Sequence, residues 1–508
     1  MSAQWLRNER RIKSISMSPM NQAEKIARPK PISFRTSVST LVAAMILAGC
    51  ATAVDTTRPV VELPSQWSEN AVATPNALQR DWWLNFNSNE LVGLIDEALA
   101  ANTDLKIATE RVRQAEITAR LAGASLAPVV TVQAGSSASW DKPAPGIPAA
   151  GSQNSGVTVG VAYEVDLWGR VAAVARGSRA SLDASRFDSQ TVQLTVTTGV
   201  ASGYFQVLAL RMRLAVAREN LAISARVQAI VDARFRFGAA AALDVSRQRT
   251  TVLQARAALL PLQVQERQTI TALSILLGRP PESLRIAALS LDAMTIPEVA
   301  VGMPSELLTR RPDLASAEAS LAGADANVAA ARAALLPTVS LSGSVGASGP
   351  GLLSLTNPAY GVELAASFVR SLFDADSRRS QVEANESARR QLVETYRRAV
   401  YTSLKEVEDA LSNAERNRQQ ELAQLEIRAE AQRSLDLSQL RYREGANDLS
   451  SVLDAQRTLF SANDSLAQLR LLRLTSSLDL FKALGGGWER PTNSVLGSVA
   501  TPVTVVRP

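Results

Sequence analysis

The chain contains one long pattern twice, and this internal duplication restricts its possible folds more than any other feature. The segment NTDLKIATERVRQAEITARLAGASLAPVVTVQAGSSAS begins at Asn102. It aligns without a gap with RPDLASAEASLAGADANVAAARAALLPTVSLSGSVGAS, which begins at Arg311, 209 residues later. Further along, RFRFG at residues 234–238 matches RYREG at 441–445, which lies 207 residues later. Two copies of about 208 residues therefore fill most of the chain, and this period excludes a short solenoid repeat.

Both copies have the same predicted order of elements: a helix, two strands, a very long helix and a return helix. Pro128 and Pro337 end the first helix of each copy, because proline cannot continue the helical hydrogen-bond ladder. Some 67 helical residues in the long helix give a rod of about 100 Å, which a globular domain does not need. The expected ranges are 90–126 and 304–335 for the first helix, 171–237 and a stretch ending at Glu444 for the long helix, and 243–277 and 449–484 for the return helix.

The predicted strands alternate between the two faces of a sheet. In VTVGVAYEVDLW, which starts at Val157, valines and a tyrosine share one face and Thr158 and Glu164 belong to the other. In the second copy, Leu364 and its apolar neighbours face one way and Glu363 belongs to the opposite set. Each strand has about 10–12 residues, the length that crosses a bilayer at a tilt.

The number of strands predicts an assembly. Four strands per chain cannot close a barrel, since about eight are the practical minimum. An open edge in lipid leaves unpaired backbone groups that cost several kcal/mol each. We therefore expect several copies to pool their strands into one barrel and their long helices into one tube.

The single cysteine, Cys50, follows a signal-like segment. An apolar run from Val38 to Ala48 comes after a basic flank and ends in the small residues Ala48 and Gly49. Such a run is too short for a membrane-spanning helix and has the length of a signal-peptide apolar region. The pattern resembles a bacterial lipobox, in which cleavage before Cys50 leaves a lipid-carrying cysteine. Ala51 after it favours the outer membrane by the same resemblance. The alternative is an ordinary secretory signal with an incidental cysteine.

The charge balance argues against a nucleic-acid partner. Residues 1–49 contain eight of the 54 Lys and Arg and two of the 48 Asp and Glu, so the rest of the chain has 46 of each. The formal charge of +6 therefore belongs to the leader. A nucleic-acid footprint needs a basic face in the mature protein, and the bulk charge gives no sign of one.

Residue types also argue against an enzyme. The sequence has no histidine and one cysteine, and it lacks a paired-carboxylate or nucleotide motif. Gly485-Gly486-Gly487 reads as a chain reversal rather than a phosphate loop, because no Lys-Ser/Thr follows it. We therefore expect no catalytic residues, no metal site and no cofactor.

Several motifs together resemble one known family, the TolC-type outer-membrane channels, and in particular their NodT-like efflux lipoprotein branch. The resemblance runs from about Cys50 to Trp488, and the Arg-Pro-Asp element and the closing Ala-Leu-Gly-Gly-Gly-Trp are specific together. The family commonly has glycines where this chain has Asp374-Ala375-Asp376. The motifs are the lipobox at Cys50, WW at 82–83 before LVGLIDEALAANTDL, YEVDLWGR from Tyr163, RRPDLASAEASLAGADANVAAARAALLPTVSL from Arg310, LFDADSRRSQ from Leu372 and LFKALGGGW from Leu480.

The resemblance implies a mostly α fold with β-structure, in which four barrel strands and long coiled-coil helices per chain form a trimeric 12-stranded β-barrel and an α-helical tunnel. It also implies a homotrimer in the outer membrane, lipid-anchored, with a long periplasmic extension. A periplasmic adaptor and an inner-membrane transporter, of the RND type, would drive this passive duct. The expected divisions are a signal peptide (1–49), a lipidated segment (50–89), the first repeat (90–280), a linker or equatorial segment (281–303), the second repeat (304–488) and a tail (489–508).

The resemblance also singles out residues near the predicted hairpin tips. Asp454 resembles the family's constriction-ring aspartate, and three copies would form a negative collar that favours cations. A solvated acid on a helix face is the equal alternative, and Asp244 is a weaker candidate. Arg441 and Tyr442 resemble residues that tie neighbouring hairpins together; for Tyr442, packing in the coiled-coil seam is the alternative.

Two further groups of residues have expected roles. Gly238 and Gly445 are expected to end the long helices, and at the tips they could also seat an adaptor hairpin. Glu164, Asp166 and Glu363 are expected to face the barrel lumen, since their neighbours form the lipid face.

Three functions compete. An efflux duct is favoured over a protein-export duct of type I secretion, because lipidation and the Gly-Gly-Gly-Trp ending argue against the latter. A lipid-anchored periplasmic scaffold without a pore is the third, but a scaffold has no use for strands of bilayer length.

Overall fold

The computed structural model describes residues 59–69, 79–141, 150–299 and 301–491. Cys50 and the lipobox lie outside these residues, as do most of the predicted C-terminal tail and the loop between the first two strands. Among the described residues, no helix has both the length and the apolar character that crossing a membrane requires.

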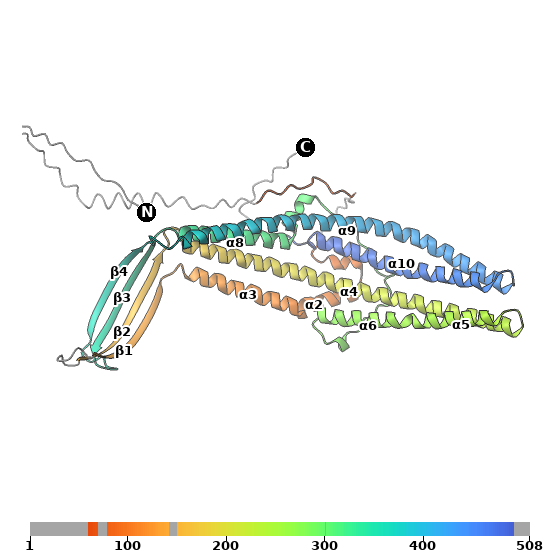
Figure 1. Cartoon of the computed structure of the whole chain (residues 1–508), viewed down its shortest axis with the longest axis horizontal. Helices are drawn as coiled ribbons and strands as arrows, with labels where there is room; N and C mark the ends of the chain where they lie inside the picture. Colours follow the sequence, from red (N-terminus) through yellow and green to blue (C-terminus); the bar gives the residue numbers. More distant parts are fainter. Residues whose placement is uncertain (1–58, 70–78, 142–149, 300, 492–508) are drawn as a thin grey trace, which may run out of the picture. The chain divides into compact units, whose positions relative to one another are not determined.

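Both copies fold into the same series of elements, as the duplication predicts (Figure 1). The two long helices, α4 and α9, each contain 67 residues. The first copy consists of α2 (Asn89–Ala101), α3 (Thr103–Ala124), β1 (Val129–Asp141), β2 (Ala150–Val165), α4 (Arg170–Arg236), α5 (Ala242–Ala257) and α6 (Leu259–Leu276). The second consists of α7 (Leu307–Arg310), α8 (Pro312–Ala333), β3 (Thr338–Pro350), β4 (Ala359–Val369), α9 (Ser377–Arg443) and α10 (Leu449–Ala483).

The first helix of each copy is broken, where the sequence predicted one continuous helix. At Asn102 the side-chain oxygen accepts a hydrogen bond from the Leu105 amide (3.0 Å) and so caps α3, while its Nδ2 donates to the Leu276 carbonyl (2.7 Å). In the second copy Arg311 is extended and Pro312 starts α8, a position that proline favours. The first return helix is also interrupted, at Ala258 between α5 and α6.

The four strands form one antiparallel sheet in the order β1-β2-β3-β4. The pairing places Val159 beside Val132 and Val345, and Val345 beside Val362, so these four valines lie on one face. The opposite face carries small and polar side chains from all four strands. Its members include Thr131, Gln133, Thr158, Glu164, Ser340, Ser342, Ser344, Glu363 and Ser367.

The four helices that connect directly to the sheet lie in the same order as the strands to which they connect. Helix α3 packs on α4, α4 on α8, and α8 on α9 (Figure 1). Past these contacts α4 packs on α5, α6 and α10, and α9 packs on α10. One edge of the arrangement is therefore formed by β1 and α3, and the other by β4 and α9.

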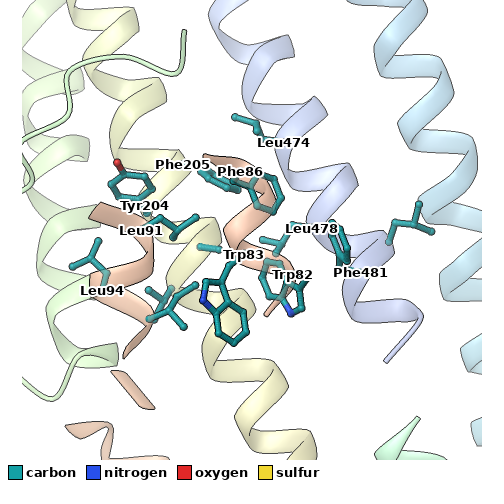
Figure 2. Packing of buried hydrophobic residues seen from close by; sticks show 14 of the residues in the cluster. Trp82, Trp83, Phe86, Leu91, Leu94, Tyr204, Phe205, Leu474, Leu478 and Phe481 are labelled. Atoms are coloured by element: carbon teal, nitrogen blue, oxygen red, sulfur yellow. The ribbon is translucent and has the colours of Figure 1, made fainter. Parts of the chain in front are cut away.

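An aromatic core joins the two copies beside the broken first helix. The Trp82 ring, in the short 3₁₀ helix η2 (Trp82–Phe86), stacks on Phe481 of α10 with centroids 5.4 Å apart. Phe86 packs against Phe205 of α4 at 5.1 Å (Figure 2). Trp82, Phe86 and Phe205 are almost completely buried. Because these rings come from η2, α4 and α10, the core fastens the start of the first repeat to the end of the second.

The triple glycine is a chain reversal, as predicted. All three residues have positive φ angles: 87° at Gly485, 59° at Gly486 and 75° at Gly487. A β-carbon on Gly485 would overlap the Arg310 carbonyl oxygen. The backbone therefore packs against the Arg-Pro-Asp segment in a way that only glycine permits.

We expect Gly485→Ala to destabilise each chain by about 3 kcal/mol or more, because it adds a backbone overlap to a left-handed conformation. Thermal unfolding of the purified protein, followed by far-UV circular dichroism, measures the loss. Gly93→Ala in α2 is the matched control, since no atom of the described residues would lie within 4 Å of a β-carbon there. Equal unfolding temperatures for the two variants would contradict this assignment.

Candidate functional site: hairpin tips and sheet faces

Each long helix ends at a glycine in a left-handed conformation. Gly238 (φ 75°) follows α4, and Gly445 (φ 79°) follows α9. The amide of Ala239 donates to the Arg234 carbonyl, and that of Ala446 donates to the Arg441 carbonyl, both at 2.8 Å. These bonds satisfy the last helical carbonyls, so both glycines end their helices as expected.

Tyr442 and Arg234 connect the two hairpins near their tips. The Arg234 guanidinium carbon lies 4.5 Å from the centroid of the Tyr442 ring, a cation–π geometry. Arg234 also donates hydrogen bonds to the carbonyls of Tyr442 and Ala239. This contact ties the end of α4 to the end of α9.

The Tyr442 side chain is buried in this contact. Its hydroxyl has no hydrogen-bond partner among the residues that the structure describes. The pKa of the Tyr442 hydroxyl is raised above its usual value, chiefly because the side chain is buried. The charge of Arg234 lowers this pKa, and that of Asp244 raises it. Tyr442 therefore remains a neutral ring at physiological pH, under a permanently charged arginine.

The acidic residues predicted for the constriction have local partners in the single chain. Asp454 lies on α10 with its side chain 72% exposed and 3.3 Å from Arg457. Asp244 accepts a hydrogen bond from the Ala241 amide at 3.2 Å and so caps the start of α5. Arg441 is exposed and does not take part in the Arg234–Tyr442 contact. A constriction role for these residues stays a prediction.

The acidic residues of the sheet have different surroundings. Glu164 accepts hydrogen bonds from Arg170 at 2.7–3.0 Å. Asp166 lies beyond the end of β2, where its two oxygens accept from the Val171 and Ala172 amides and cap α4. Glu363 is exposed on the polar face, opposite Ser344. Helix capping by Asp166 is a local role that the sequence did not predict.

Comparisons with known proteins place this arrangement in a family. The profile of the outer membrane efflux protein family matches residues 94–279 and 303–486. This chain belongs to the outer membrane efflux protein family.

Individual efflux proteins agree with this assignment over nearly their whole length. The pyoverdine export outer membrane protein OpmQ of Pseudomonas aeruginosa is 39% identical over 465 residues, covering 89% of this chain and 97% of OpmQ. The probable efflux pump outer membrane protein TtgC of Pseudomonas putida is 32% identical, covering 92% of this chain and 99% of TtgC.

Solved structures confirm the TolC-like fold. A crystal structure of CusC has a TM-score of 0.78 at 27% identity, covering 86% of this chain and all of that one. The outer-membrane channel OprN has a TM-score of 0.77 at 26% identity, covering 85% of this chain and 99% of OprN. This outer-membrane efflux protein is therefore mostly helical with a four-stranded antiparallel sheet, as the resemblance implied.

A buried polar cluster on the sheet side of the hairpin tips was not predicted from the sequence. Gln248 of α5 donates to the Ser224 carbonyl of α4 at 2.7 Å. Gln456 of α10 donates to the Ser224 hydroxyl and to Asn220 Oδ1 (3.1 Å). All but Asn220 are almost fully buried. The two glutamines are equivalent in the duplication, since each begins a Gln-Arg-Thr triplet, and this repetition was the signal available in the sequence.

Proposed function

We propose that this protein is the passive exit duct of a three-part efflux system, in which three copies close one barrel of twelve strands and extend a helical tunnel into the periplasm. The observation that carries the proposal is the sheet itself. It has a mostly apolar face, a polar face and two edges, at β1 and β4, that pair with no other strand among the described residues. A lipid-facing exterior and a polar lumen have this distribution.

Aromatic residues support a position in the bilayer. On the apolar face, Trp140 and Tyr360 lie toward the loop ends of β1 and β4, and Tyr163 and Phe368 lie toward the helices. Tyr360 and Phe368 are eight residues apart, about 26 Å along the strand. Aromatic rows near both ends of membrane-spanning strands are typical of the two membrane–water interfaces.

The helices supply the periplasmic reach. A helix of 67 residues is about 100 Å long, so the tips at Gly238 and Gly445 lie far from the sheet. We place a periplasmic adaptor at these tips and an RND-type transporter beyond it. In the assembly, Asp454, with Asp244 as a second candidate, would line a constriction, and Glu164 and Glu363 would face the lumen.

The lipid anchor and the divisions of the chain belong to the same proposal. An acylated Cys50 would hold the first residues of the mature chain at the outer membrane. The first repeat (90–280) and the second repeat (304–488) would each contribute two strands and one hairpin to the assembly, joined through the equatorial segment (281–303). No chemical step is needed in the duct, because the transporter supplies the energy.

The relatives favour small molecules as cargo. OpmQ is named for pyoverdine export and TtgC for an efflux pump, and this chain aligns with both over nearly their full length. A protein-export duct of type I secretion remains the alternative within the class, and a scaffold without a pore is the alternative outside it.

Two measurements separate these functions. The purified protein in planar lipid bilayers should give uniform single-channel conductance steps, whereas silence would favour the scaffold. A deletion strain should accumulate small toxic compounds and recover export on complementation. Loss of a secreted protein with unchanged export of small compounds would identify the type I duct instead.

A further inference from the structure

We propose that the free edge of β4 pairs with the free edge of β1 in a neighbouring copy of this chain at one defined register, with Ala365 opposite Ser137 and Ala366 opposite Ser136. This inference rests on the proposed assembly of several copies. The register itself comes from the chain's own duplication, which provides one complete junction between repeats inside each chain.

The two repeats correspond residue by residue. Helices α4 and α9 have the same length and start 207 residues apart, at Arg170 and Ser377. The first strands correspond at an offset of 209 residues. The hydrogen-bond registers obey both offsets: Val129 pairs with Ala162 in the first copy, and Thr338 pairs with Val369 in the second.

The junction inside the chain is the pairing of β2 with β3, which joins the first repeat to the second. There Thr158 lies opposite Gly346, and Val159 lies opposite Val345. The equivalent of each β2 residue in β4 has a number 207 higher, and the equivalent of each β3 residue in β1 has a number 209 lower. Replacing both partners by their equivalents converts this junction into one between β4 and the β1 strand of the next copy. The resulting pairs are Ala365 with Ser137 and Ala366 with Ser136.

Strand β4 ends three residues earlier than its equivalent in the first repeat. Strand β4 stops at Val369, whose equivalent in β2 is Ala162, the last residue that pairs with β1. Strand β2 continues to Val165 because β3 pairs with it there. The corresponding residues 370–372 have no such partner in the part of the chain that the structure describes, and Leu372 is 93% exposed. The proposed register supplies residues 130–132 of the neighbouring copy as that partner.

Exposure along β4 agrees with this explanation. Leu364 is 85% exposed, whereas its equivalent Val157, which lies between two paired strands, is 36% exposed. The proposed register sets Leu364 opposite Ala138 and Phe368 opposite Ala134, so the apolar face continues from one copy to the next. A slip of one residue would set apolar side chains beside the polar face.

Residues on the helices also agree with the proposed register. At the internal junction Gly177 of α4 lies against α8, where an added β-carbon would be 3.5 Å from the Ala326 β-carbon. The same offsets bring Ala384 of α9 against Ile117 of α3 in the next copy. Ala384 is exposed, and Ile117 is 46% exposed although it is large and apolar. A small residue therefore again faces the incoming helix at the equivalent position.

Disulfide formation between engineered cysteines tests the register in the full-length, lipidated protein in outer membranes. The pairs are Ala365→Cys with Ser137→Cys, and Ala366→Cys with Ser136→Cys. Adjacent pairs in an antiparallel ladder alternate between about 4.5 and 5.5 Å in Cα separation, and both values allow a disulfide. We expect reducible species of two and three chains on gels for at least one pair, and none in single-cysteine variants, which control for Cys50.

The matched control is Ala365→Cys with Ser139→Cys, which lies two residues away on the same face. Its Cα separation would be about 7–8 Å, so we expect at least tenfold less cross-linked product. Stronger cross-linking of this displaced pair would overturn the register and leave the assembly intact. No cross-linking of any pair in a protein that has the mass of three chains would show that these edges do not meet. A monomeric protein would instead refute the proposed function.

Discussion

Replacing Leu364 by arginine should almost abolish assembled protein in the outer membrane. Leu364 lies in the middle of β4, on the apolar face, and is 85% exposed in the single chain. An arginine on the lipid face near the bilayer midplane costs about 2–4 kcal/mol, or about 6–12 kcal/mol over three copies. Quantifying the trimer in purified outer membranes on gels of unheated samples, together with the drug sensitivity of the complemented deletion strain, measures the effect.

The neighbouring residue gives a matched control. Ala365 belongs to the same strand but to the polar face, because it pairs with Ser342 while Leu364 pairs with Gly343. Ala365→Arg should therefore leave assembly nearly unchanged, since its side chain would enter a water-filled lumen. If both variants assembled equally, or if Ala365→Arg were the more harmful, the assignment of the two faces would be wrong.

Replacing Arg234 by methionine should favour the open tip and raise single-channel conductance several-fold. The change removes a cation–π contact with Tyr442 and two hydrogen bonds to carbonyls, which we value at about 2–4 kcal/mol per copy. These interactions tie α4 to α9, so their loss releases one hairpin from the other. Conductance in planar bilayers and entry of antibiotics that the closed channel excludes measure the change.

Arg236→Met is the control for this experiment. Arg236 occupies the last turn of the same helix and is exposed, so its removal changes the charge of the tip by the same amount without breaking the contact. We expect wild-type conductance for it. An equal rise in conductance for both variants would show that charge controls the tip, and wild-type conductance for both would show that the contact between the hairpins does not hold the tip closed.

Much of the fold could be predicted because two simple patterns repeat. Alternating side chains identified the strands, and the paired registers place Val159 and Thr158 on opposite faces, as expected. The positions of the helix-ending glycines followed from local chemistry, since Gly238 and Gly445 need a left-handed conformation. The break at Asn102 could not be foreseen, because its amide also bonds to Leu276, which lies 174 residues away in sequence.

The sites were less predictable because their contacts are distant or involve other copies. Arg234 reaches Tyr442 across 208 residues, so no local pattern marks this pair. Asp166 was expected to face the lumen. Its carboxylate also caps α4, because it lies beside the start of that helix. Ala375 and Asp376 adopt positive φ angles (52° and 60°), a conformation that glycine adopts most easily. A convergence of Asp454 residues requires neighbouring chains.

We expect that one chain cannot complete its sheet and that three copies do so together. The mass of the protein component of the purified full-length protein in mild detergent tests it most directly, by native mass spectrometry or by light scattering corrected for detergent. We expect the mass of three chains, with β-structure retained in the far-ultraviolet spectrum. A stable single-chain species with that same β-content would contradict the claim.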